Sequence, residues 1–193
     1  MTYTEQNFNH LLGTTGFSDK LLQNHFKLYA GYVLNTNKAL DLLKTLEVGS
    51  PAWAEIKRRF GWEFNGMRLH ELYFGNMNKE KKTMPENTPL FKLMVESFGS
   101  GQGCKDNFVS VGKMRGIGWV IMTYDPIAKK LFNVWINEHD VGLLAGAVPL
   151  LVMDVFEHAY VTDYGIDRAS YIAAFIEAID WDVVQKRFKD AKV

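Results

Sequence analysis

A long stretch of helical periodicity constrains the fold of this chain most. Apolar side chains recur at steps of three and four residues over about 19–46, which is the spacing of one face of an α-helix. A Gly-Ser-Pro turn at 49–51 is typical of one helix ending and another beginning, with serine as the cap and proline at the first helical position. A second apolar stripe follows over 53–74. The sequence therefore predicts two long helices folded into an antiparallel hairpin.

Two glycines lie inside the second predicted helix, at Gly61 and Gly66. Glycine in a helix interior costs about 1 kcal/mol relative to alanine. That cost predicts a kink, or the close approach of another group to the helix backbone, at these two positions.

The chain beyond the hairpin has a mixed pattern. Residues 78–88 are polar and rich in turn formers, and they predict a boundary between an N-terminal helical domain, 1–85, and a C-terminal domain, 86–193. Two runs of aromatic and β-branched residues, 119–124 and 131–136, flank a turn and predict a β-hairpin.

A third and more buried strand is predicted at 149–153, just before an acidic residue. Helices are predicted at 89–98, 103–114, 168–179 and 181–189. The predicted fold class is α+β, with a long antiparallel helical hairpin followed by an α/β domain.

Composition and charge exclude several kinds of partner. Lys plus Arg equals Asp plus Glu at 22 each, so we expect no binding to nucleic acid or to a membrane surface. The first residues lack the character of a signal peptide, and no apolar run reaches membrane-spanning length. Cys104 is the only cysteine, so no internal disulfide is possible and a reducing compartment is expected. We expect a cytoplasmic protein.

Candidate metal ligands stand on several predicted elements. His25 and His70 lie on the apolar faces of the two long helices, and helical bundles build metal sites from such facing side chains. Asp154 and His158 follow the buried strand, four residues apart, and His139 follows the second strand of the β-hairpin. Three imidazoles and a carboxylate suit iron, manganese or zinc. The alternatives are buried structural histidines and an aspartate that caps a helix, and from these residues alone both redox and hydrolytic chemistry stay open.

Several motifs, in the same order along the chain, resemble the iron/manganese superoxide dismutase family. The family pattern D-x-W-E-H-A-Y is similar to DVFEHAY at 154–160, and its G-S-G-W is similar to GIGW at 116–119. The pattern F-N followed by H-x3-W resembles FNGMRLHELYF at 64–74. The pattern D-Y-x-N-x-R-x-x-Y resembles DYGIDRASY at 163–171, and N-W before the last helix resembles DW at 180–181.

The resemblance implies a fold, a reaction and a cofactor. The fold would pair the helical hairpin with a C-terminal domain containing a three-stranded antiparallel sheet flanked by helices. The activity would be conversion of superoxide to oxygen and hydrogen peroxide by a metal that cycles between the 2+ and 3+ states. One iron ion per subunit, with manganese as the alternative, would be the cofactor. The protein would be a homodimer or a dimer of dimers.

The resemblance also assigns roles to individual residues. The implied metal ligands are His25, His70, Asp154 and His158. The implied gateway tyrosine is Tyr32, and His139 is expected beside it as a second catalytic residue. Glu157 is expected to bond His158 of the opposite subunit. The residues expected around the ligands or at the subunit interface are Glu157, Trp119, Phe156, Tyr160 and Arg168.

Two departures from the family pattern bear on the catalytic pair. The family spacing from histidine to gateway tyrosine is usually eight, whereas His25 and Tyr32 are seven apart, and one residue turns a helix by about 100°. If the extra residue of the family forms a helix bulge, Tyr32 keeps its place. Gly66 stands where some members supply a glutamine from the second helix, so His139 is expected to replace that glutamine.

Two further departures concern packing and the subunit interface. Phe74 and Phe156 replace two tryptophans usual at the site, and Val161 replaces a second tyrosine after the E-H-A motif. The first-helix histidine that pairs with that tyrosine across subunits is also absent. The alternative function is therefore a metal-binding or scaffold homologue without catalysis, and a zinc or iron enzyme with other chemistry is a third hypothesis.

Overall fold

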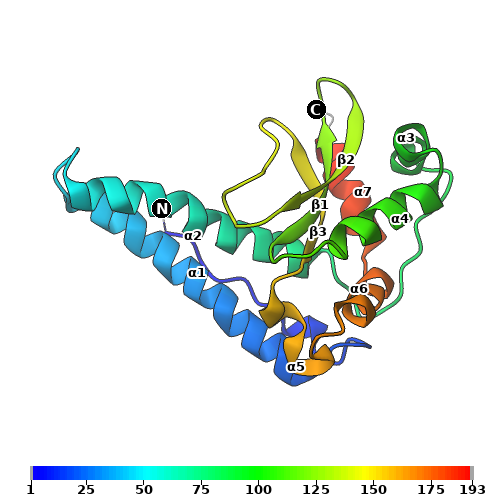
Figure 1. Cartoon of the computed structure of the whole chain (residues 1–193), viewed down its shortest axis with the longest axis horizontal. Helices are drawn as coiled ribbons and strands as arrows, with labels where there is room; N and C mark the ends of the chain where they lie inside the picture. Colours follow the sequence, from blue (N-terminus) through cyan, green and yellow to red (C-terminus); the bar gives the residue numbers. More distant parts are fainter. Residues whose placement is uncertain (1, 192–193) are drawn as a thin grey trace.

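The computed structural model describes residues 2–191 and has an α+β architecture (Figure 1). Residues 1 and 192–193, which end the two domains expected from the sequence, lie outside the described part. Two long helices form one side of the molecule, and a three-stranded sheet with shorter helices forms the other.

The two long helices are α1 (Asp19–Thr45) and α2 (Pro51–Gly75), packed as the predicted hairpin. Serine side chains begin both: Oγ of Ser18 accepts from N–H of Leu21 at 3.1 Å, and Oγ of Ser50 accepts from N–H of Trp53 at 3.2 Å. Such a cap satisfies a backbone donor that has no partner within its own helix. The bounds match the sequence prediction to within one residue.

The sheet contains β1 (Trp119–Asp125), β2 (Lys130–Ile136) and β3 (Val148–Asp154), in the order β2-β1-β3. Both pairings are antiparallel, and a register shift between Met122 and Thr123 interrupts the pairing of β1 with β3. The predicted hairpin and third strand are therefore confirmed. The register places Asp154, the last residue of β3, opposite Trp119, the first residue of β1.

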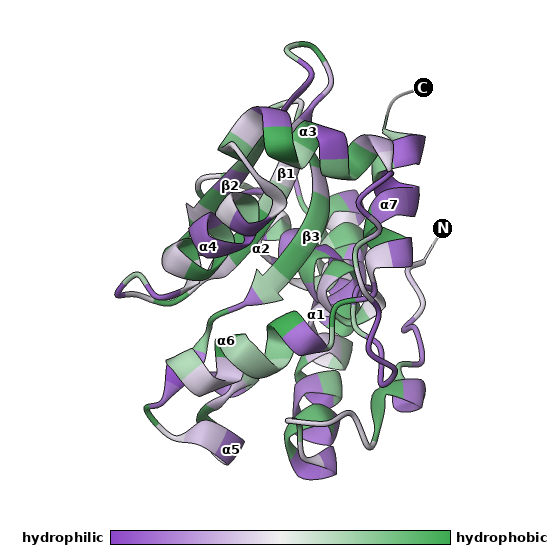
Figure 2. Ribbon diagram, turned by 90° about the vertical axis from the view of Figure 1, so that its right-hand side faces the viewer, coloured by the Kyte–Doolittle hydropathy of each residue, from purple (hydrophilic) through white to green (hydrophobic). Residues whose placement is uncertain are grey.

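The shorter helices of the second half surround the sheet. They are α3 (Pro89–Phe98), α4 (Gly101–Gly112), α6 (Arg168–Glu177) and α7 (Trp181–Asp190). Helices α3 and α4 contact β2, whereas α2 and α7 contact β3. Strand β3 is largely apolar and lies in the middle of the molecule in Figure 2. No helix within residues 2–191 is long and apolar enough to cross a membrane.

Three short elements were not predicted: the 3₁₀ turns η1 (Asn9–Leu11) and η2 (Glu157–Ala159), and the one-turn helix α5 (Val161–Tyr164). Each has three or four residues, which is too short to show a hydrophobic period. One of them matters for the site, because η2 follows β3 directly and carries His158.

Candidate metal centre

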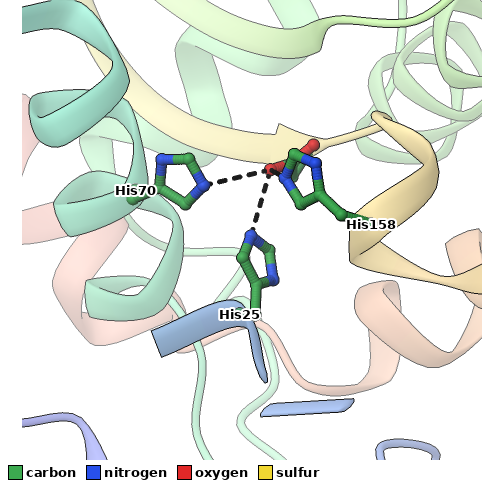
Figure 3. Close-up of side chains that lie close together, drawn as sticks. His25, His70 and His158 are labelled. Carbon is green, nitrogen blue, oxygen red and sulfur yellow. Dashed lines mark hydrogen bonds and ion pairs between the residues drawn. The ribbon is translucent and has the colours of Figure 1, made fainter. Parts of the chain in front are cut away.

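Four predicted ligands meet between the hairpin and the sheet. Figure 3 shows the imidazoles of His25, His70 and His158 converging on one carboxylate, that of Asp154. Nε2 of these histidines lies 3.2, 3.6 and 3.1 Å, respectively, from Oδ2 of Asp154. The four donor atoms all lie within 4.8 Å of one another. Helices α1 and α2, strand β3 and turn η2 each supply one donor.

The donor atoms fit a bound cation. Nε2 of His25 and Nε2 of His70 are buried and have no hydrogen-bond partner within the described residues. A buried nitrogen left without a partner costs about 1–3 kcal/mol, and a metal ion at the centre of the cluster would satisfy both atoms. Three imidazoles and one carboxylate are a donor set for iron, manganese or zinc.

The protonation of the cluster favours metal binding. Burial holds the pKa of His25 below its ordinary value and the pKa of His70 well below it. Burial would by itself raise the pKa of Asp154, but the nearby imidazoles of His158 and His25 outweigh it and hold that pKa low. Neutral imidazoles and an ionised carboxylate are the forms that bind metals.

Backbone contacts orient two of the ligands. Nδ1 of His70 lies 2.5 Å from the carbonyl oxygen of Gly66, which only accepts, so this nitrogen carries the proton and Nε2 presents its lone pair to the cluster. Oδ1 of Asp154 accepts from N–H of Phe156 at 2.8 Å, which leaves Oδ2 facing the imidazoles. The hydroxyl of Tyr171 donates to the carbonyl oxygen of Asp154 at 2.6 Å and fixes the end of β3.

A second cluster lies against the ligands and includes both predicted catalytic residues. The hydroxyl of Tyr32 lies 2.8 Å from Nε2 of His139, and the ring of Tyr32 stacks on His70 with centroids 5.1 Å apart. Trp119 donates its indole N–H to Nδ1 of His139 at 3.0 Å. Helix α1 is regular α-helix throughout, so Tyr32 reaches the site at the seven-residue spacing without a bulge.

The protonation of His139 follows from its partners. Burial lowers the pKa of His139 to about 4, so the ring is neutral at neutral pH. Because the indole of Trp119 can only donate, Nδ1 must accept and the ring proton sits on Nε2. Nε2–H then donates to the hydroxyl oxygen of Tyr32, whose own proton is free to be donated elsewhere. Burial also raises the pKa of Tyr32, so its hydroxyl keeps that proton.

Gly66 makes room for this arrangement. A Cβ atom on Gly66 would lie 2.5 Å from Cδ1 of Tyr32, closer than carbon atoms can approach. The predicted close approach at Gly66 is therefore confirmed. At Gly61 the nearest atom to such a Cβ would be Cβ of Asp140, at 4.0 Å, which is ordinary contact. The glycine at 66 leaves space for the ring of Tyr32, and α2 runs through both glycines without a break.

Of the other residues predicted near the ligands, Phe156 contacts a ligand, whereas Tyr160 and Arg168 contact other groups. The ring of Phe156 stacks on His158 with centroids 5.5 Å apart, and Tyr160 stacks on Tyr171. Arg168 donates to the carbonyl oxygens of Gly116 and Met114. The structure therefore places Arg168 as a tie between α6 and the loop before β1.

Glu157 and one unpredicted residue complete the surroundings. Glu157 is exposed, and His158 beside it is 31 % exposed. Trp62 was not predicted, although it stands eight residues before His70 and so near the same face of α2. Its ring packs against His139 with centroids 4.6 Å apart, and its indole N–H donates to Glu138 at 3.2 Å. That helical spacing was the signal in the sequence that could have identified Trp62.

Fold and donor set together define a metalloprotein whose centre is closed by a helical hairpin on one side and a β-sheet on the other. The sequence profile described as "Iron/manganese superoxide dismutases, C-terminal domain" matches residues 85–187. The chain belongs to the iron/manganese superoxide dismutase family. This confirms the family and the fold class predicted from the motifs, and with them an enzyme of the oxidoreductase class.

Curated relatives match most of the chain. Superoxide dismutase [Mn] 2 of Haloferax volcanii is 35% identical over 175 residues, which cover 89% of this chain and 86% of that protein. Superoxide dismutase [Fe] of Aquifex pyrophilus is 34% identical over 185 residues, covering 91% and 86%. Superoxide dismutase [Fe] of Cupriavidus metallidurans is 34% identical over 183 residues, covering 92% and 91%. Similar relatives thus carry names for either metal.

Proposed function

We propose that this protein dismutates superoxide at the centre formed by His25, His70, Asp154 and His158. The observation that carries the proposal is the convergence of three imidazoles and one carboxylate, with two buried nitrogens that find no hydrogen-bond partner among residues 2–191. Two superoxide anions and two protons give one oxygen and one hydrogen peroxide. When bound, an iron or manganese ion would supply the one-electron redox couple that this reaction requires.

The protein itself supplies geometry and protons. The four ligands hold the ion in a buried site, where fixed donors act more strongly than they do in water. Tyr32 keeps its hydroxyl proton beside the ligand His70, and His139 holds that hydroxyl in place from Nε2. Trp119 fixes the tautomer of His139. We therefore assign Tyr32 as the proton donor to the peroxide product and His139 as the residue that orients it.

We propose one ion per chain, with iron as the metal and manganese as the alternative. The donor atoms suit both metals, and the relatives carry names for both. Zinc also suits these donors but has no redox couple in this range, so it cannot support dismutation.

We also propose a homodimer, or a dimer of dimers, in which Glu157 bonds His158 of the opposite subunit. The exposure of Glu157 and the partial exposure of His158 support the proposal, because a partner subunit would cover both. We keep the division into 1–85 and 86–193 as the proposed domains. A cytoplasmic location is proposed from the single cysteine, Cys104, which is buried and free.

The proposal is tested by loading the metal-free protein separately with iron, manganese and zinc, then measuring bound metal and the decay of superoxide. Decay should scale with bound iron or manganese and should be absent with zinc. Full iron or manganese occupancy with no decay above that caused by free metal would favour the homologue without catalysis.

A further inference from the structure

A half-buried arginine joins three elements close to the metal centre. Arg187 on α7 is half-buried and makes no ion pair within the described residues. Its Nη1 donates to the carbonyl oxygen of Leu150 at 2.9 Å and to Oδ1 of Asn76 at 3.1 Å. Its Nη2 donates to the carbonyl oxygen of Leu72 at 2.9 Å. Arg187 therefore connects α7 to the end of α2 and to the middle of β3.

Asn76, which ends α2, makes the direct link between α2 and β3. Its side chain is fully buried, and Oδ1 accepts from N–H of Val152 at 2.8 Å as well as from Arg187. Its Nδ2 donates to the carbonyl oxygens of Tyr73 at 2.8 Å and Val152 at 3.2 Å. The amide thus bonds both backbone groups of Val152, as a neighbouring strand would.

These contacts lie between two metal ligands along the chain. His70 precedes Asn76 by six residues of α2, which is about 9 Å along the helix axis. Asp154 follows Val152 by two residues of β3, which is about 7 Å along the strand. The same two elements therefore meet twice, once through the amide of Asn76 and once where Nε2 of His70 approaches Oδ2 of Asp154 at 3.6 Å. A shift of α2 against β3 at the first contact changes the distance at the second.

The backbone leaves room for the arginine. A Cβ atom on Gly75 would lie 3.2 Å from Nη2 of Arg187, so any larger residue would press on the guanidinium. Burial without a carboxylate is unfavourable for a guanidinium, and it lowers the pKa of Arg187 to about 10. The three backbone and amide oxygens are the groups that hold it there.

We propose that Arg187 and Asn76 are positioning residues for the metal centre: together they set the placement of α2 against β3, and so the spacing of His70 and Asp154. This inference rests on the proposed function, because it concerns the metal that the four ligands would hold. Helix α7 contributes no ligand, but through Arg187 it would affect how tightly the metal is held.

The test follows the release of metal from the loaded protein to an excess of chelator. Arg187→Gln removes the guanidinium and should speed release about tenfold, the lower end of what loss of an outer contact to a metal site costs. Arg187→Lys keeps a donor and should lie between wild type and Arg187→Gln. The electron paramagnetic resonance spectrum of the bound ion should change in Arg187→Gln, since the ligand spacing changes.

Val184→Ala is the matched control, because Val184 is fully buried on the same helix and its side chain has no hydrogen-bonding group. It should lower the urea midpoint and leave metal release and the spectrum unchanged. If Arg187→Gln fails to fold, Arg187→Lys carries the test, because a single ammonium group cannot reproduce the two-nitrogen contact that the guanidinium makes.

Two results would overturn the inference. One is metal release and a spectrum in Arg187→Gln equal to those of wild type or, where that variant does not fold, the same result in Arg187→Lys. The other is an equal acceleration in Val184→Ala, which would make the effect one of general stability. A wild-type protein that binds neither iron nor manganese would instead overturn the proposed function, and this inference with it.

Discussion

His139 shows at the scale of one residue how burial and hydrogen bonds fix the protonation of a side chain. Burial lowers the pKa of its ring to about 4, and the indole of Trp119 determines which nitrogen carries the proton. In the unfolded chain the same ring has an ordinary pKa near 6.5. The unfolded state therefore binds a proton between about pH 6.5 and pH 4 while the folded state does not, and stability falls as the pH drops through this range.

This linkage predicts the pH dependence of a single substitution. Glutamine at position 139 can accept from Trp119 and donate to Tyr32 but has no proton to gain. Between about pH 7.5 and pH 5, the metal-free wild type should lose about 2 kcal/mol more stability than His139→Gln. Urea unfolding of both proteins at the two pH values measures the difference. Equal losses would mean that His139 titrates normally in the folded protein.

The sequence predicted most of the residues that lie at the site. It did not predict the contacts that these residues make with one another. The ligand identities followed from motifs and from histidines on apolar helix faces. The placement of Tyr32 could not be settled from its spacing to His25, since the answer depends on whether α1 contains a bulge. Trp62 was missed because a tryptophan on an amphipathic helix is usually part of the core.

At the scale of elements, α1 and α2 approach each other closely where the ring of Tyr32 lies against Gly66. Gly66→Ala would place a methyl group 2.5 Å from the ring of Tyr32. The ring must then move from His70 and from His139, with an expected loss of about 1–3 kcal/mol from overpacking. Urea unfolding measures the loss, and the decay of superoxide catalysed by the loaded enzyme should slow, because Tyr32 is displaced from its place as proton donor.

Gly31→Ala is the control, because no atom lies within 4 Å of the Cβ that it would add and Gly31 is also inside a helix. It should be neutral, or more stable by up to about 1 kcal/mol, owing to the higher helix propensity of alanine. A Gly66→Ala protein as stable as Gly31→Ala would show that the two helices separate at little cost.

Long elements were predictable and short ones were not. The N-termini of α1 and α2 are set by Ser18, Ser50 and Pro51. Each of these residues affects only the backbone within a few positions of it, so a local sequence pattern reveals it. Helix α4 begins at Gly101, two residues before its predicted start, because Ser100 caps it by accepting from N–H of Gly103 at 2.8 Å. Glycines on both sides of Ser100 are unfavourable in a helix, so the sequence did not predict that the helix begins there. The turn η2 is set by the end of β3, which no local pattern encodes.

At the scale of the whole molecule, the proposed dimer would complete the site. Glu157→Lys should abolish assembly, because a lysine cannot accept a hydrogen bond from His158 of the opposite subunit. Its ammonium group would also repel positive charge on that imidazole. Sedimentation velocity should give the mass of one chain, and bound metal per chain should fall. Glu86→Lys makes the same charge change at another exposed glutamate and should stay assembled. A Glu157→Lys protein with wild-type mass would place the interface elsewhere.

In the proposed function one cluster carries the whole reaction, and Asp154 is its common member because its Oδ2 faces all three histidines. Asp154→Asn keeps the size of the side chain and removes its charge. The measurement is the rate of superoxide decay per folded chain, for wild type and Asp154→Asn prepared with the same metal supply. The account predicts decay in wild type that is proportional to bound iron or manganese, and decay at the background rate in Asp154→Asn. Decay at the wild-type rate in Asp154→Asn would contradict it.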